Sequence, residues 1–272
     1  MEYEIKPQSK LTLGFAELWQ YRELFYFFTW RDVKVKYKQT ILGFLWAVLQ
    51  PFLMMIVFTV FFGRALKVPS ENIPYPVFVF SGLILWNVFS SGLTAAGNSM
   101  VSNANIIKKI YFPRLIIPIS AVLVALFDFL MSFMIFIGML LYFKTSVDVP
   151  KFILFIPVGL LIASISTFGL GSLLAALNIK YRDFRYVIPF MVQALLFLTP
   201  VIYPVSIITH QWMKYLLALN PMYAAIELFR SGIVNNPIDL NLIAISLVSA
   251  VVFFIGGIYY FRKTESYFAD LA

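Results

Sequence analysis

Long apolar runs dominate the pattern of hydrophobic and polar positions along this chain of 272 residues. The runs are continuous, rich in Leu, Ile and Phe, and close to the roughly 20 residues that a helix needs to cross a bilayer. They do not show the ten-residue alternation that is typical of a membrane β-barrel. The pattern therefore predicts six transmembrane helices, over residues 41–63, 75–97, 115–143, 152–177, 187–204 and 240–261.

The segment before the first run, residues 11–39, mixes aromatic and charged side chains. This mixture is typical of an amphipathic helix that lies in the plane of the lipid headgroups. The sequence thus divides into a cytoplasmic amphipathic interface segment, residues 1–40, and a six-helix transmembrane domain, residues 41–272. We predict an all-α integral membrane fold.

The connection between the second and third predicted spans, residues 98–114, is longer than two antiparallel helices require. It begins polar, becomes basic at Lys108 and Lys109, and carries isoleucines at helical spacing. We expect a short helix parallel to the membrane here. The segment is either a docking surface for a soluble partner or a solvated, positively charged loop.

Residues 205–239 are moderately apolar but are interrupted by prolines. Two pieces, residues 207–219 and 222–233, are too short to cross the membrane and predict a re-entrant helical hairpin on the outer side. Glu227 and Arg230 lie three residues apart, so we expect them to pair on one helical face.

Composition excludes several classes of protein. The chain is 61% hydrophobic and 12% charged, whereas soluble domains average roughly 45–50% apolar and about 25% charged residues. A soluble enzyme, a disordered protein and a fibrous protein are therefore excluded. The chain has no Cys and one His, which leaves no thiolate nucleophile, no Cys-ligated zinc and no pair of His ligands for a metal. We assign no catalytic, cofactor-binding or metal-binding residues.

The net charge of +8 is mainly a signal of membrane topology. The first forty residues contain no early apolar segment, so they do not form a cleaved secretory signal. With six spans and a cytoplasmic amino terminus, fifteen of the 21 Lys and Arg residues lie inside. This bias follows the positive-inside rule and places both termini in the cytoplasm. Nucleic-acid binding is disfavoured because the basic residues border membrane spans.

Two features carry candidate chemistry. Asp128 is the one acidic residue near the centre of a predicted span, where an ionisable group is costly and often functional. It is either a hydrogen-bonded structural residue, which we favour, or a proton-relay carboxylate. The basic residues that follow the aromatic segment either anchor it to anionic membrane lipids or meet a phosphate-bearing substrate at the cytoplasmic leaflet.

Helical wheels of the first, second and fifth spans align aromatic residues along stripes. Such stripes are either packing and lipid contacts, or the wall of a translocation path on which sugar rings stack. An ion path would require fixed charges or rings of carbonyl groups. The candidate path residues are Phe44, Met55, Phe58, Phe62, Phe78, Trp86, Phe89, Phe190, Gln193 and Phe197.

Four segments resemble a known family. YKQTILGFLWAVLQP at 37–51, YFPRL at 111–115, TPVIYP at 199–204 and NPMYAAIELFRSG at 220–232 are similar to elements of ABC-2 type permeases that export polysaccharides. The segments occur in the family's order and cover nearly the whole chain. The resemblance implies an ABC-2 type exporter fold, with an interface helix, a coupling helix at 98–114 and an outer hairpin.

The resemblance also implies a function. The chain would be the permease subunit of an exporter in the bacterial inner membrane that moves undecaprenyl-diphosphate-linked polysaccharide, most of all O-antigen, or the related teichoic acid and capsule polymers. Two copies would form the path, and each would bind a separate ATPase subunit that holds ATP and Mg²⁺. In agreement, the chain contains no GxxxxGK[ST] phosphate loop.

The resemblance and the charge pattern together suggest roles for named residues. Residues implied in coupling to the ATPase are Asn105, Lys108, Lys109, Tyr111, Phe112, Pro113 and Arg114. Candidates to attract the lipid diphosphate are Arg31, Lys34, Lys36 and Lys38. Candidates for an outer gate are Tyr203, Pro204, Glu227 and Arg230.

Three other functions stay open at this point. The first is an ABC-2 permease with the same fold that moves a drug or a lipid. The second is a proton-coupled secondary carrier, which would depend on Asp128 and not on ATP. The third is a membrane scaffold that transports nothing.

Overall fold

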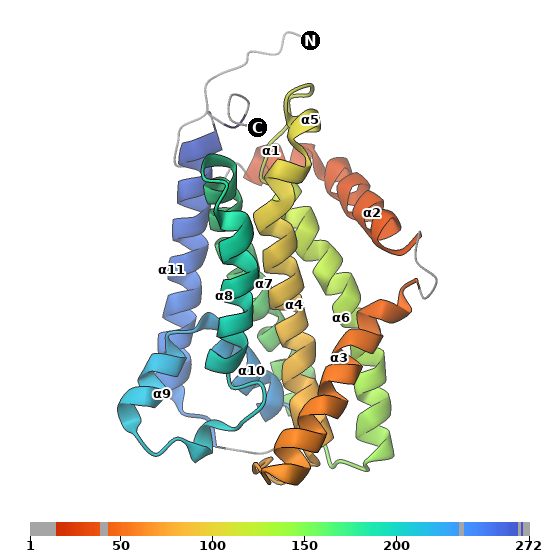
Figure 1. Cartoon of the computed structure of the whole chain (residues 1–272), viewed down its shortest axis with the longest axis vertical. Coiled ribbons are helices and arrows are strands. Elements are labelled where there is room, and N and C mark those ends of the chain that lie inside the picture. The colour runs from red at the N-terminus through yellow and green to blue at the C-terminus, as the bar shows by residue number, and fades with distance from the viewer. Residues whose placement is uncertain (1–14, 39–42, 234–236, 266–267, 269–272) are drawn as a thin grey trace.

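The computed structural model describes residues 15–38, 43–233, 237–265 and 268, and over these residues it contains helices and no strands (Figure 1). Prolines stand at or next to the first position of α4, α7 and α10, where their missing N–H costs no hydrogen bond. The elements are α1 (Phe15–Gln20), α2 (Arg22–Lys38), α3 (Leu45–Phe58), the π-helix η1 (Thr59–Ala65), α4 (Tyr75–Ser102), α5 (Ala104–Ile107), α6 (Ile116–Tyr142), α7 (Val149–Lys180), α8 (Phe184–Leu198), the 3₁₀ turn η2 (Val205–Ile207), α9 (Gln211–Ala218), α10 (Pro221–Ser231) and α11 (Leu240–Thr264). The predicted all-α fold is confirmed for the described residues.

Five helical stretches in the described part of the chain are long and apolar enough to cross a membrane. They are α3 with η1, α4, α6, α7 and α11, and they correspond to five of the six predicted spans. Their number and composition identify a multi-pass membrane protein.

The predicted fifth span, residues 187–204, differs from the expectation. It contains α8, a helix of 15 residues, which is about 22 Å long at 1.5 Å per residue. The helix ends at Leu198 because the residue before a proline avoids the helical conformation, and Thr199 precedes Pro200. The prediction of six full spans is therefore not confirmed, although α8 packs against α4 and α7.

The short elements gather at the two ends of the bundle (Figure 1). We call one end the α5 end, because α1, α2, α5 and the last turns of α11 lie there, and the other the hairpin end, where α9, α10 and η1 lie. The predicted helices near 98–114, 207–219 and 222–233 correspond to α5, α9 and α10. The predicted interface helix over 11–39 corresponds to α1 and α2; residues 11–14 and 39, and the boundary at residue 40, lie outside the described residues.

The most buried span is α4, which packs against α6, α7 and α10. In its most apolar window 78% of residues are buried, against 22% in α3 with η1. Because α4 is enclosed by its own subunit, any side chain that it leaves exposed stands out as a candidate for contact with water or substrate.

Two glycines allow α7 and α11 to approach closely. A side chain at Gly257 of α11 would overlap the carbonyl oxygen of Gly169 on α7, whereas one at Gly256 would meet no atom within 4 Å. Small residues at such contacts allow membrane helices to pack backbone against backbone.

We expect Gly257→Ala to push α7 and α11 apart and to lower the free energy of unfolding by about 1–3 kcal/mol, as overpacking does. A thermal melt of the purified protein in lipid nanodiscs measures this loss. Gly256→Ala is the matched control in the same helix and should melt like the wild type. Equal melting temperatures for the two variants would contradict the close contact.

Candidate functional site

A polar groove opens at the α5 end of α4. It has a volume of about 1030 Å³ and is bounded by α2, α4 and α6, by single residues of α3 and α8, and by the turn that leads to α5. We call this space the polar groove. Its α4 wall carries Asn87, Ser90, Ser91, Thr94, Asn98 and Ser102.

The polar wall is a helical stripe. Asn87, Ser91, Thr94 and Asn98 recur every three or four residues and are half-buried. Within this wall Ser91, Thr94 and Asn98 donate to carbonyls one turn earlier on α4, at 2.6, 2.7 and 2.9 Å. The hydroxyl oxygens can still accept hydrogen bonds from a ligand. This stripe was not among the predicted site residues, although its spacing is visible in the sequence, because the aromatic residues of the same span form a stronger pattern.

A second hollow of about 390 Å³ extends the polar groove toward the hairpin end. Gln50, Asn87 and Thr94 border both spaces, so the two are adjacent. Among the predicted path residues, Trp86 and Gln193 line this extension. The extended groove thus passes from a polar wall to a partly aromatic one.

The other predicted path residues lie elsewhere. On α4, Phe78 and Phe89 are 0% and 1% exposed and belong to the core of the subunit. The remaining candidates fall into a buried group and an exposed group. Met55 and Phe58 are buried and Phe62 is half-buried, whereas Phe44, Phe190 and Phe197 are exposed. The structure therefore does not bring these aromatic residues together around one cavity of the subunit.

The four basic residues predicted to attract a diphosphate lie on two sides of α2. Arg31 and Lys36 border the polar groove. Lys34 and Lys38 border a separate hollow of about 390 Å³ beside Trp30, whose ring centre lies 5.3 Å from the Lys34 ammonium nitrogen. Arg31 borders that hollow as well. Of the four basic residues, Lys36 is therefore the one that borders the polar groove and not the hollow.

Arg31 joins α2 to the end of α4. One of its guanidinium nitrogens lies 2.9 Å from Oδ1 of Asn103, the residue that ends α4, and 2.7 Å from a carboxylate oxygen of Asp32. The guanidinium also lies 4.8 Å from the ring centre of Phe28. These contacts fix the position of α2 over the groove.

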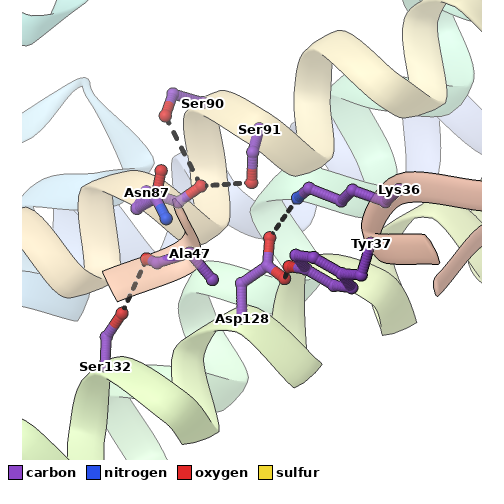
Figure 2. A network of polar contacts seen from close by, with 8 residues as sticks. All are labelled: Lys36, Tyr37, Ala47, Asn87, Ser90, Ser91, Asp128 and Ser132. Carbon is purple, nitrogen blue, oxygen red and sulfur yellow. Dashed lines mark hydrogen bonds and ion pairs between the residues drawn. The ribbon is translucent and has the colours of Figure 1, made fainter. Parts of the chain in front are cut away.

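Asp128 of α6 is 1% exposed and pairs with two residues of α2 (Figure 2). One carboxylate oxygen accepts from the Lys36 ammonium group and the other from the Tyr37 hydroxyl. Asp128 is thus hydrogen-bonded, as the interpretation that we favoured requires. The sequence analysis could not identify its partners, because they lie about ninety residues earlier and outside the predicted spans.

Four residues after Asp128, Ser132 holds α3. Pro51 inside α3 has no N–H for the carbonyl oxygen of Ala47 one turn before it. Ser132 of α6 donates to that oxygen at 3.1 Å (Figure 2). One helix, α6, is therefore hydrogen-bonded to both α2 and α3.

The predicted coupling segment is anchored at one end and exposed at its tip. Phe112 and Pro113 are buried, and Phe112 lies 5.5 Å from Phe28 of α2 between ring centres. Arg114 donates to the backbone carbonyl of Glu265, just after α11. Four predicted coupling residues are exposed at the tip. They are Asn105, Lys108, Lys109 and Tyr111.

At the hairpin end, Arg230 holds the TPVIYP segment against α4. It is 3% exposed, and it donates to the carbonyls of Pro200 and Val201 at 2.6 Å and to that of Phe78 at 3.2 Å. Gly82 of α4 makes room, since a side chain there would come within 2.8 Å of the guanidinium.

The predicted pairing of Glu227 with Arg230 is wrong as an ion pair. Within the described residues no ion pair of 4.0 Å or less joins the two side chains, because backbone carbonyls occupy the guanidinium. Tyr203 donates to the carbonyl of Phe197 at 3.0 Å, and Pro204 precedes η2. The gate role of these four residues stays a prediction.

No metal site is present among the described residues. No group of three or more His, Asp or Glu side chains there is close enough to hold an ion. The chemistry that the polar groove offers is hydrogen bonding along α4, with one cation, Arg31, at its α5 end and a second, Lys36, beside Asp128 near the middle of α6.

Comparison with known proteins agrees with this architecture. Residues 23–234 match the family described as ABC-2 type transporter, and the chain belongs to this family. The O-antigen export system permease protein RfbA of Myxococcus xanthus is 31% identical over 257 residues, which cover 92% of this chain and 96% of that protein. RfbA of Klebsiella pneumoniae is 28% identical over 241 residues, 89% of this chain and 92% of that protein. The polysialic acid transport protein KpsM of Escherichia coli is 25% identical over 244 residues, 87% of this chain and 92% of that protein.

We expect Arg230→Met to destabilise the protein strongly. The variant keeps much of the side-chain volume but leaves the buried carbonyls of Pro200 and Val201 without donors, at about 1–3 kcal/mol for each. A thermal melt in nanodiscs should show a clear decrease. Tyr203→Phe, which removes one exposed hydrogen bond, should shift the melt much less. A wild-type melting temperature for Arg230→Met would show that the hydrogen bonds from Arg230 to these carbonyls do not stabilise the protein.

Proposed function

We propose that the chain is the permease subunit of an ATP-driven exporter that moves a lipid-diphosphate-linked polysaccharide, of the O-antigen type, across the bacterial inner membrane. The observation that carries the proposal is its 31% identity, over nearly its whole length, with an O-antigen export permease. Similarity to KpsM favours a second cargo, a capsule polymer that resembles polysialic acid.

The polar groove supports a glycan as the cargo. Its hydroxyl and amide side chains can exchange hydrogen bonds with sugar hydroxyls. The hydroxyls of Ser91 and Thr94 already bond to their own helix, so each sugar contact is a weak addition. Weak contacts of this kind allow a long polymer to slide without stopping at one site.

A separate ATPase subunit is part of the proposal. It would bind ATP and Mg²⁺, since this chain has no phosphate loop. The exposed tip beyond α5 is the surface that we assign to it: Lys108 and Lys109 lie beside Ile110 and Tyr111, which are 62% and 72% exposed. Exposed tyrosines are typical of protein-binding surfaces.

Two copies of the chain would enclose the full path. The polar groove is bounded on one side by α3 and α8. Phe44, just before α3, and Phe190 and Phe197 of α8 are exposed in the single subunit. A second copy or lipid would cover this apolar surface. In this arrangement the α5 end and both termini face the cytoplasm.

The proposed function is tested by deletion of the gene in its own bacterium. We expect lipid-linked polymer to accumulate inside the cell and to disappear from the surface, measured by surface labelling of intact and permeabilised cells. Depletion of ATP should have the same effect in the wild type. Continued surface display in the deletion strain would refute the proposal, and export that resists ATP depletion would favour a proton-coupled carrier.

We expect Tyr111→Ala to weaken binding of the ATPase subunit about tenfold, as loss of a tyrosine at an interface often does. The fraction of ATPase that co-purifies with the tagged permease measures this effect. Tyr142→Ala, at the exposed end of α6, is the matched control. If both variants retain the same amount of ATPase, the tip beyond α5 is not the coupling surface.

A further inference from the structure

The two donors that hold Asp128 differ in what else they can reach (Figure 2). Lys36 borders the polar groove and its side chain is 43% exposed. Its ammonium group has three N–H donors, so it can contact a second anion while it stays near the first. Tyr37 is half-buried and does not line the groove.

The Tyr37 hydroxyl donates to Asp128 and is held in its protonated form. The residue lies on α2, outside the membrane spans, and burial together with the hydrogen bond to Asp128 raises the pKa of its phenol. The phenol therefore stays protonated and continues to donate. Asp128 would retain one donor even if Lys36 moved away, which lowers the cost of a buried carboxylate.

A second cation faces the same space. Arg31 lies one and a half turns before Lys36 on α2 and also borders the groove. Its guanidinium has five donors in a planar fork, and the contacts described above engage it with Asp32 and Asn103. The groove thus offers two cations along α2, each with an anionic or amide partner already present in the fold.

We propose that Arg31 and Lys36 bind the diphosphate of the lipid-linked cargo, and that Asp128 is the internal counter-ion that competes with this diphosphate for Lys36. The identity of the cargo rests on the function proposed above. Lys34 and Lys38, which border the other hollow, contribute to attraction of anionic lipid and not to this site.

Competition gives Asp128 a positioning role in transport. A diphosphate carries several charge-assisted acceptors and would bind tightly if both cations were unpartnered. Because the Asp128 carboxylate forms its ion pair with Lys36 again, the diphosphate is held for a shorter time and can leave the groove. The empty state is restored by an ion pair that is already built into the fold.

The test measures binding of geranylgeranyl diphosphate to the permease, co-purified with its ATPase and placed in nanodiscs without nucleotide. Geranylgeraniol is the control for the apolar tail. We expect Lys36→Met to raise the Kd about tenfold, the effect of one lost charge-assisted contact. Asp128→Asn should lower the Kd several-fold, because Lys36 is no longer shared.

Lys180→Met removes the same charge at an exposed position outside the groove and should bind the probe within about twofold of the wild type. A merely structural Asp128 predicts the opposite sign, since disruption of α2 would weaken binding. An Asp128→Asn variant with wild-type or weaker affinity overturns the proposal, as does unchanged affinity in Lys36→Met.

Tyr37→Phe is a second variant, and it tests the same idea if Asp128→Asn does not fold. It removes one donor from Asp128, which then holds Lys36 more strongly, so the Kd for the probe should rise at least about twofold. A Kd that is unchanged or lower contradicts competition.

Failure of this inference differs from failure of the proposed function. If Lys36→Met exports polymer and binds the probe like the wild type, the inference fails while the exporter stands. If the gene deletion leaves export intact, the exporter fails, whatever the affinity for the probe.

Discussion

The burial of the Asp128 carboxylate is the constraint on which the polar groove depends. A carboxylate that is 1% exposed is tolerated only when donors come to it, because removing one partner of a buried ion pair costs about 3–5 kcal/mol. Lys36 and Tyr37 meet this need, and they bring the end of α2 onto α6. The wall of the groove that α2 forms therefore depends on the charge of α6, together with the contacts of Arg31 with Asn103 and of Phe28 with Phe112.

The same principle operates at two other places in the bundle, near Pro51 and near Pro200. Backbone carbonyls without partners are costly in a membrane, and prolines create them. Ser132 takes the carbonyl of Ala47 that Pro51 leaves free, and Arg230 takes those of Pro200 and Val201. Side chains of one helix thus satisfy the backbone of another, which ties the ends of the groove together.

Much of the fold could be predicted from the sequence, because apolar length and proline positions act locally. Five spans and the two helices α9 and α10 follow from these signals. The fifth predicted span was too long, since hydropathy continues past the helix end that Pro200 imposes.

The candidate site was harder to predict because its contacts are not local. Asp128 could be recognised as unusual, but its partners on α2 depend on how two distant segments pack. The rule for pairs three residues apart failed at Glu227 because carbonyls of another segment compete for Arg230. Aromatic stripes did not separate Phe78, which lies in the core, from Trp86, which lines the groove extension.

A path for the polymer through the groove can be tested by capturing the polymer there. A photo-reactive amino acid replaces Ser91, on the groove wall, or Leu130, an exposed residue of α6, in cells that export polymer. If the polymer passes through the groove, we expect position 91 to form glycan-bearing adducts and position 130 to form none. Formation of the adducts at position 91 should require the ATPase. Export that continues with no adduct at position 91, or with equal adducts at both positions, would contradict a path through this groove.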